Sequence, residues 1–263
     1  MFNPIIFYEF GKGRKAFVST WKTDNTSTGS STSTQVKLPL ISSGTYAFRV
    51  DWGDGTANNI TVWNAAATTH TYASAGTYTI KITGICTGWQ FNNTGDKLKI
   101  LSVSSWGSLK FAGNQAAHFY GCANLSLSTV SDVLDLSGST NLSDAFRDCT
   151  SITTINRVNE WNTTGITLTV RTFQNAINFN SNIGNWVMNL VTHINSMFNG
   201  AASFNNGESP SINNWVFSVL TQTNAVFDGA AVFNQPIGNW NMSLVTDINA
   251  FFRNATLFNH PLS

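Results

Sequence analysis

Large aromatic residues that recur at one shared set of intervals constrain the C-terminal half of the chain most strongly. One phenylalanine column starts at Phe173 and continues after 25, 29 and 25 residues, and a second phenylalanine, an asparagine and a tryptophan column keep these intervals. A unit of this length cannot bury its rings alone, so the pattern predicts stacked units whose equivalent rings form continuous internal columns. The predicted repeat core is Phe173, Phe179, Trp186, Phe198, Phe204, Trp215, Phe227, Phe233, Trp240, Phe252 and Phe258.

The long interval and the weaker repeats upstream set the expected limits of this stack. An insertion around residues 207–210 accounts for the interval of 29 and should bulge from one surface. Upstream, Phe119, Phe146 and Phe173 are 27 residues apart, so we expect the stack to begin near Leu98. Each unit should combine a short strand, as at residues 191–194, with a short helical turn, as at residues 196–201.

Four dipeptides of the units carry a family resemblance, and three of them recur. They are a Met-Phe at 197–198, a Phe-Asn at 204–205, an Asn-Trp at 185–186 and a Val-Thr at 191–192. This combination resembles the BspA-type leucine-rich repeat of bacterial surface proteins. The resemblance implies a leucine-rich-repeat-like solenoid over residues 98–263, built from short strands and short helical turns, and a role in display or binding.

Residues 15–90 show a different pattern, with short apolar runs that alternate with polar residues and are separated by turn residues. Tyr46, Phe48 and Val50 alternate in one run, and Tyr78 and its neighbours do so in another. Period-two alternation with turn signals at this spacing predicts an antiparallel β-sandwich, so the fold class expected for the whole chain is mainly β.

Two segments of this region, residues 51–56 and 69–78, resemble the PKD domain, an immunoglobulin-like module of extracellular and surface proteins. The Trp-Gly-Asp-Gly turn at 52–55 and the His-x-Tyr and Gly-x-Tyr steps at 70–72 and 76–78 carry the resemblance. The residues assigned to this structural turn are Asp51, Trp52, Gly53, Asp54, Gly55, His70, Tyr72, Gly76 and Tyr78.

The acidic residues of this turn have a structural and a metal-binding interpretation. We expect Asp54 to accept hydrogen bonds from its own turn backbone, and His70 to pack beside the turn. Calcium at Asp51 and Asp54 is the alternative, because hard cations prefer carboxylate oxygens, although calcium usually takes more ligands than this segment supplies.

The composition argues against several function classes. Charged residues make up only 10% of the chain and the net charge is +1, so the clustered cations that nucleic acid requires are missing. The four histidines are scattered, and no nucleophile motif, phosphate loop or zinc spacing occurs, so we predict no enzyme, no catalytic residues, no metal site and no other cofactor. We also expect no membrane span. Residues 23–34 are rich in Thr, Ser, Asn and Gly, and we expect them to form a mobile loop.

Cys122 and Cys149 occupy equivalent places one unit apart. We expect them to be buried free thiols, because cysteine is a small apolar filler in such columns, while a disulfide between them stays open as the alternative.

These features together predict a non-enzymatic, surface-exposed structural or adhesion protein. The modules are of extracellular type but no export signal precedes them, which favours a phage virion component on the virion surface, such as a capsid decoration or fibre protein. Residues 1–14 would form an N-terminal arm that contacts other virion or surface proteins. The last unit lacks a polar cap, so it would offer a second contact, allow a homo-oligomer, or be followed by more of the natural polypeptide after Ser263.

Two other functions remain open at this point. One is a fragment of a bacterial cell-surface adhesin that binds a host protein or glycan. The other is a carbohydrate-binding module in which sugars stack on Trp186, Trp215 and Trp240, although strict recurrence favours these rings as core residues.

Overall fold

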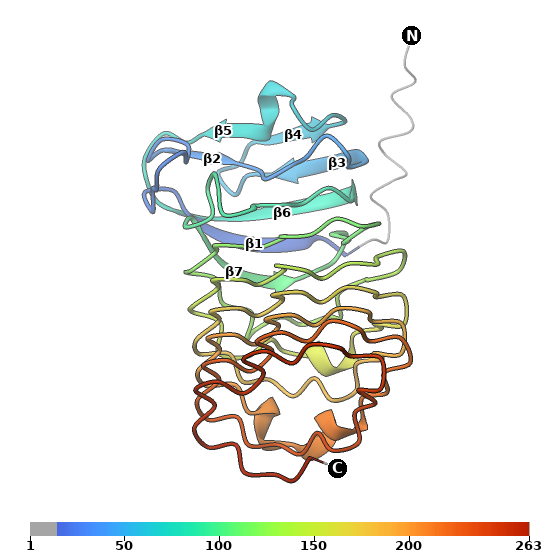
Figure 1. Cartoon of the computed structure of the whole chain (residues 1–263). Helices are drawn as coiled ribbons and strands as arrows, with labels where there is room; N and C mark the ends of the chain where they lie inside the picture. The colour runs from blue at the N-terminus through green and yellow to red at the C-terminus, as the bar shows by residue number, and fades with distance from the viewer. Residues whose placement is uncertain (1–14, 263) are drawn as a thin grey trace.

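A computed structural model describes residues 15–262, in which the fold is mainly β: antiparallel sheets come first, and a stack of coils follows them along one axis (Figure 1). The predicted N-terminal arm, residues 1–14, lies outside the described residues. The strands are β1 (Phe17–Lys22), β2 (Gln35–Lys37), β3 (Tyr46–Asp51), β4 (Ala57–Ile60), β5 (Thr69–Thr71), β6 (Thr77–Cys86) and β7 (Ile100–Ser105).

The strands form a five-stranded sheet in the order β4-β3-β6-β1-β7 and a two-stranded sheet of β2 and β5, and all strand pairs are antiparallel. The period-two pattern has its expected effect on β3, where Tyr46, Phe48 and Val50 are buried. Ile80 and Ile82 of β6 are buried with them. Burial of alternate residues thus sets which face of the large sheet meets the core.

The sheet and the stack are joined through β7 and through a shared core. One edge of β7 pairs with β1, while its other edge makes a parallel bridge from Ser102 to Ser126 in the first coil. Phe91 lies between the two parts, with its ring centroid 5.9 Å from that of Trp21 and 6.0 Å from that of Phe119. The chain therefore buries one continuous apolar core rather than two separate ones.

Successive coils are joined by parallel bridges between equivalent residues, such as Leu168 to His193 and His193 to Gln222. The strand predicted at 191–194 is accordingly reduced to this bridge. The helical turn predicted at 196–201 is also absent: the amides of Ser196, Phe198 and Gly200 donate to carbonyls of the following coil, at 2.8, 2.9 and 2.7 Å. Ser196 also has φ of 54°, which interrupts any right-handed helical run.

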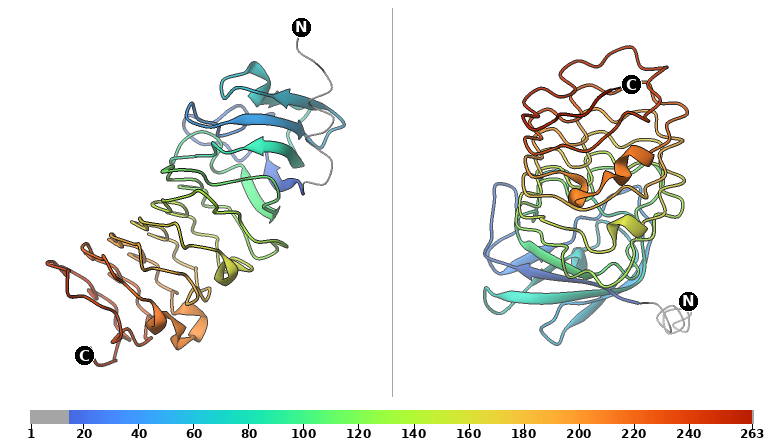
Figure 2. Two further views of the ribbon diagram at one scale, coloured as in Figure 1. Left: turned by 90° about the vertical axis from the view of Figure 1, so that its right-hand side faces the viewer. Right: turned by 90° about the horizontal axis from the view of Figure 1, so that it is seen from below.

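The helical segments within residues 15–262 are short 3₁₀ turns, namely η1 (Ala66–Thr68), η2 (Val158–Glu160), η3 (Asn206–Glu208) and η4 (Pro210–Asn214). None of them has the length and apolar character needed to cross a membrane. The segments η3 and η4 contain the insertion at 207–210 and stand out from the side of the stack (Figure 2). The longer unit therefore keeps its place in the stack by extruding the extra residues.

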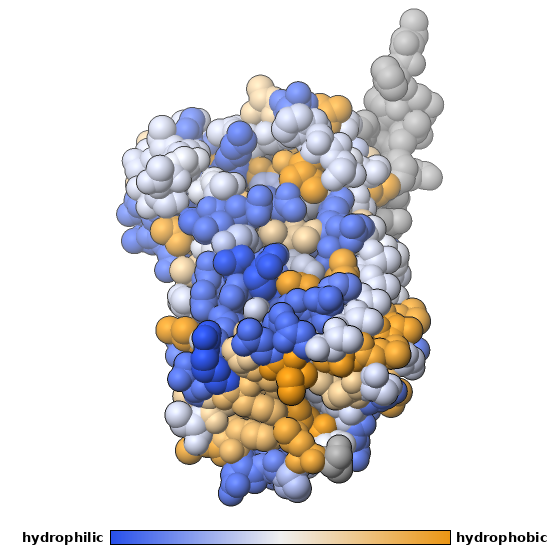
Figure 3. Space-filling view, in the orientation of Figure 1, coloured by the Kyte–Doolittle hydropathy of each residue, from blue (hydrophilic) through white to orange (hydrophobic). Residues whose placement is uncertain are grey.

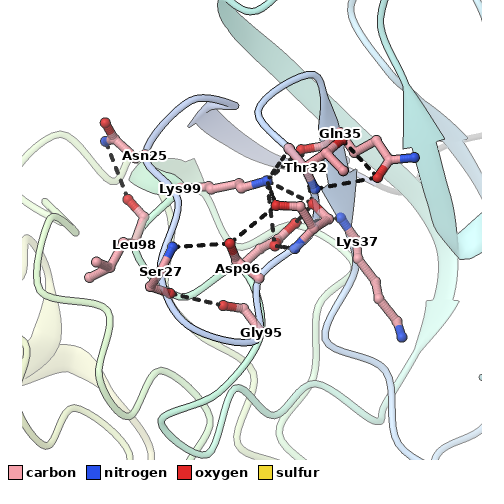
Figure 4. Close-up of polar contacts among 11 residues, drawn as sticks. Asn25, Ser27, Thr32, Gln35, Lys37, Gly95, Asp96, Leu98 and Lys99 are labelled. Atoms are coloured by element: carbon pink, nitrogen blue, oxygen red, sulfur yellow. Dashed lines mark hydrogen bonds and ion pairs between the residues drawn. The ribbon is translucent and has the colours of Figure 1, made fainter.

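The polar run at 23–34, predicted to be a mobile loop, is held in place by two buried charges (Figure 4). The Lys99 ammonium group donates to the carbonyl oxygens of Ser31, Thr32 and Gln35 at 2.7–2.9 Å. Asp96 accepts from the backbone N–H groups of Ser31 and Lys37, both at 2.7 Å. Both charged side chains are fully buried, so the loop is anchored to the folded core, although residues 24–34 remain at least partly exposed.

Candidate functional site

The interior of the stack is filled by two phenylalanine columns. The Phe198 ring is fully buried and lies parallel to the equivalent rings of the preceding and following coils, Phe173 at 5.8 Å and Phe227 at 5.5 Å between centroids. Phe204 of the second column stacks on Phe198 within the same coil at 3.8 Å. At the last coil, Phe252 and Phe258 continue both columns but are only partly buried.

The tryptophan column closes the interior on another side. The indole N–H groups of Trp186, Trp215 and Trp240 each donate to a carbonyl of the preceding coil, at 2.9, 3.2 and 2.9 Å. These side chains are 3%, 1% and 5% exposed. Sugar stacking needs an open ring face, so the three tryptophans do not form the carbohydrate platform considered from the sequence.

An asparagine ladder runs along the stack beside the rings. The Asn180 side-chain carbonyl accepts from the backbone N–H of Asn205 at 2.8 Å, Asn205 accepts in the same way from Asn234 at 2.8 Å, and Asn234 from Asn259 at 2.9 Å. The sequence shows that asparagine recurs, but it does not show that the asparagine side chains form hydrogen bonds to the next coil. Each bond satisfies a backbone donor that a turn would otherwise leave unpaired.

The predicted turn residues of the first module lie together around His70. The His70 Nε2 atom is 2.7 Å from a carboxylate oxygen of Asp54, and the imidazole stacks on the Trp52 indole at 4.8 Å between centroids. The Tyr72 hydroxyl donates to the Trp52 carbonyl at 2.9 Å, and the Tyr72 ring stacks on Tyr78. The remaining assigned residues shape the backbone, with Gly53 and Gly55 at positive φ, Asp51 accepting from the Gly53 N–H, and Gly76 against the Tyr78 ring.

The Asp54 carboxylate is fully engaged by this turn. One oxygen accepts from the backbone N–H and the hydroxyl of Thr56 at 2.9 and 2.6 Å, and the other faces His70. Burial favours a higher pKa, but these hydrogen bonds from Thr56 and His70 outweigh it and lower the pKa of Asp54 to about 2. In residues 15–262 no three His, Cys, Asp or Glu side chains gather as a metal site, and the oxygens that calcium would need at Asp54 are already used.

The three cysteines of the chain are buried free thiols. Burial raises the pKa of Cys86 to about 12, and it also raises the pKa values of Cys122 and Cys149. The Cys149 Sγ donates to the Phe119 carbonyl at 3.1 Å. A buried thiol that stays protonated is a poor nucleophile, so these residues act as packing groups.

The last described coil has a face that no other described coil covers, called here the open end of the stack. The backbone N–H groups of Ala225, Phe227 and Gly229 donate to the last coil, but the equivalent groups of Ala250, Phe252 and Asn254 make no hydrogen bond within the described residues. A pocket of about 280 Å³ opens here, lined mainly by Ile237, Trp240, Met242, Ile248, Phe251, Phe252 and Leu262. Figure 3 shows apolar residues gathered over the C-terminal coils of one face.

Comparison with protein families gives one match to this region. Residues 140–263 match the family model described as "Mycoplasma protein of unknown function, DUF285". The matched segment covers the coils in which the phenylalanine and tryptophan columns are most regular. No curated protein matches the chain. No solved structure matches it either.

Proposed function

We propose that this protein is a non-enzymatic, surface-exposed scaffold, displayed as a structural component of a phage virion, such as a capsid decoration or fibre protein. The observation that carries the proposal is the closed aromatic stack, which makes a rigid arm and leaves an apolar, hydrogen-bonding face at its end. A rod of this kind holds a binding surface away from its attachment point, which is the task of a displayed protein.

In this proposal the first module is an immunoglobulin-like sandwich of the PKD type. Its support is the turn in which Asp54, His70 and Trp52 contact one another, together with the two antiparallel sheets. The coils are proposed to be a BspA-type leucine-rich-repeat solenoid, supported by parallel bridges between equivalent residues and by the regular rings. Both module types belong to proteins that display or bind.

The open end of the stack is the proposed contact with a further protein, and a second copy of this chain is the first candidate. Ile248 and Leu262 are 61% and 60% exposed there, beside the unpaired N–H groups of the last coil. Exposed apolar area next to free backbone donors favours association over solvation. The proposed anchoring role of the arm at residues 1–14 rests on the sequence alone.

Association through the open end is tested by light scattering of the purified chain. We expect an oligomer that the double variant Ile248→Glu/Leu262→Glu converts to a monomer with unchanged far-ultraviolet circular dichroism. Val216→Glu is the matched control, because Val216 is equally exposed, at 64%, but lies on the flank of the stack. A wild-type monomer, or a control variant that dissociates equally, contradicts self-association through this face.

Display is tested by immunogold electron microscopy with antibodies against residues 15–262. Label on phage particles released from the source cells is expected. The second candidate, a bacterial cell-surface adhesin, predicts label on the cell envelope instead and shares the same observation of a rigid stack. Label confined to the cell interior contradicts both functions.

A further inference from the structure

A second surface with the properties of a binding site lies where the first module meets the first coil. It is a cleft of about 890 Å³, within the range of about 300–1,000 Å³ typical of small-ligand sites. Its walls come from the loop at 40–45, from Trp63 after β4, from Thr87 and Gln90 after β6, and from the coil segment 112–116. The cleft is distinct from the open end of the stack, since the two share no lining residue.

The walls of the cleft are held in fixed positions by hydrogen bonds that cross from one segment to another. The Gln90 side-chain amide donates to the Ala116 carbonyl at 2.7 Å, and the Gln90 backbone N–H donates to the Pro39 carbonyl at 2.8 Å. Thr87 accepts from the Thr45 backbone N–H at 3.0 Å. A ligand would therefore meet a preformed surface and would lose little affinity to ordering of the protein.

The lining carries no charged residue. It offers neutral groups that both donate and accept hydrogen bonds: the amides of Gln90, Asn114 and Gln115 and the hydroxyls of the loop at 40–45. The Gln115 side-chain carbonyl is buried and has no hydrogen-bond partner within the described residues. Buried polar atoms are normally paired, and this acceptor lacks a partner although its residue lines the cleft.

Trp63 supplies an aromatic surface at the same cleft. It is 45% exposed, whereas the other eight tryptophans of the chain are at most 5% exposed. Its indole N–H makes no hydrogen bond within the described residues, and no other aromatic ring of that part of the chain contacts its ring. A flat apolar ring beside neutral hydrogen-bonding groups matches a sugar ring, which presents C–H groups on one face and hydroxyls around its edge.

We propose that this cleft binds a neutral glycan, with one sugar ring stacked on Trp63 and its hydroxyls bound by the amides of Gln90, Asn114 and Gln115. The absence of charge from the lining disfavours sulfated, phosphorylated or sialylated glycans and acidic or basic peptides. The inference deepens the proposed function, and it rests on that function because only a surface-exposed protein would meet glycans. It does not depend on association through the open end of the stack.

The inference is tested with immobilised polysaccharides in two groups, neutral hexose polymers and N-acetylhexosamine polymers, with an acidic glycan as a third arm. We expect retention on at least one of the two neutral groups, and titration of the matching soluble oligosaccharide should show a change of less than twofold in affinity between 50 and 500 mM salt, about what uncharged contacts allow. Trp63→Ala should weaken binding by about tenfold or more, as for a central aromatic contact.

Val62→Ala is the matched control for Trp63→Ala, because Val62 is the adjacent residue, is 50% exposed and does not line the cleft. Gln115→Ala should weaken binding without changing the thermal midpoint, since the carbonyl that it removes has no partner in the free protein. Binding to neither neutral group, stronger binding to the acidic glycan or to a peptide, or equal binding by Trp63→Ala overturns the inference. The Ile248→Glu/Leu262→Glu variant should still bind the glycan. Loss of self-association and loss of glycan binding can therefore be told apart.

Discussion

Replacement of Phe198 by alanine should destabilise the fold by about 3–5 kcal/mol, the cost of removing a large ring from a fully packed interior. The ring is completely buried and touches stacked partners on three sides, Phe173, Phe227 and Phe204. Backbone hydrogen bonds fix the spacing between neighbouring coils, such as that from the Phe198 N–H to the Val226 carbonyl at 2.9 Å. These coils cannot collapse into the space left by the ring, which favours the upper half of this range.

The assay is urea unfolding at 25 °C followed by far-ultraviolet circular dichroism, with free energies compared only where the m-value is unchanged. Phe258→Ala is the matched control, because that ring ends the second column and is only partly buried, so about 1–2 kcal/mol is expected. Val216→Ala, at an exposed flank position, should change stability by no more than about 0.5 kcal/mol. A loss for Phe198→Ala below about 1 kcal/mol, or no larger than that for Phe258→Ala, would refute the packed-column interpretation.

Three further predictions concern the polar and backbone features of the fold. Asn205→Leu leaves the part-buried N–H of Asn234 and the buried side-chain amide of Gln235 without their acceptor and should cost about 1–3 kcal/mol in urea unfolding. Asn259→Leu, at the end of the same ladder, should cost less than about 0.5 kcal/mol, and equal losses would contradict the ladder. Gly53→Ala should lower the thermal midpoint much more than Gly55→Ala does. Both residues have positive φ, but only at Gly53 would an added Cβ clash with a backbone oxygen of β6. A larger loss for Gly55→Ala would contradict this packing of the turn against β6. Asp54 has a pKa of about 2 in the fold and an ordinary value of 3.8, so the stability that its carboxylate contributes is present above about pH 4 and is lost as the pH falls towards 2. The difference in thermal midpoint between wild type and Asp54→Asn should therefore shrink between about pH 4 and pH 2. A constant difference would argue against the lowered pKa of Asp54.

The periodic features of this fold could be predicted because they are repeated in the sequence. The intervals of 25 and 29 residues that Phe173, Phe198 and Phe227 share with the other columns imply equivalent places in stacked coils, and all three rings are buried. The same reasoning failed for the secondary structure within each coil. It expected every amide of the helical turn to bond within the unit, but the amides of Ser196, Phe198 and Gly200 bond to the next coil, and only the alternate ones bond within the unit.

Each coil has two left-handed positions, and only one of them carries a clear sequence signal. Residues 121, 148, 175, 200, 229 and 254 form the first set and are all Gly, Asn or Asp. The second set has no such preference. Positive φ recurs at the coil intervals in Ala117, Asp144, Arg171, Ser196, Ala225 and Ala250. Apart from Asp144, these residue types do not favour the left-handed region, and hydrogen bonds between coils hold them in it. A conformation that is imposed by a neighbouring coil cannot be read from local preference.

Long-range contacts explain the other differences. Lys99 orders a polar loop that lies 64–68 residues earlier in the chain, so composition alone suggested a mobile segment there. The cleft at Trp63 combines a loop of the first module with residues 112–116 of the first coil. No spacing rule connects those segments, and they meet only because β7 joins the sheet to the stack.

The central claim is that the large rings close the interior of the molecule instead of lining an open groove, and acrylamide quenching of tryptophan fluorescence tests it most directly. In Trp63→Phe every remaining tryptophan is at most 5% exposed. We predict that the native variant has blue-shifted emission that acrylamide quenches only weakly, whereas acrylamide quenches the emission of the urea-unfolded chain strongly. Efficient quenching of the native Trp63→Phe variant would contradict the closed stack.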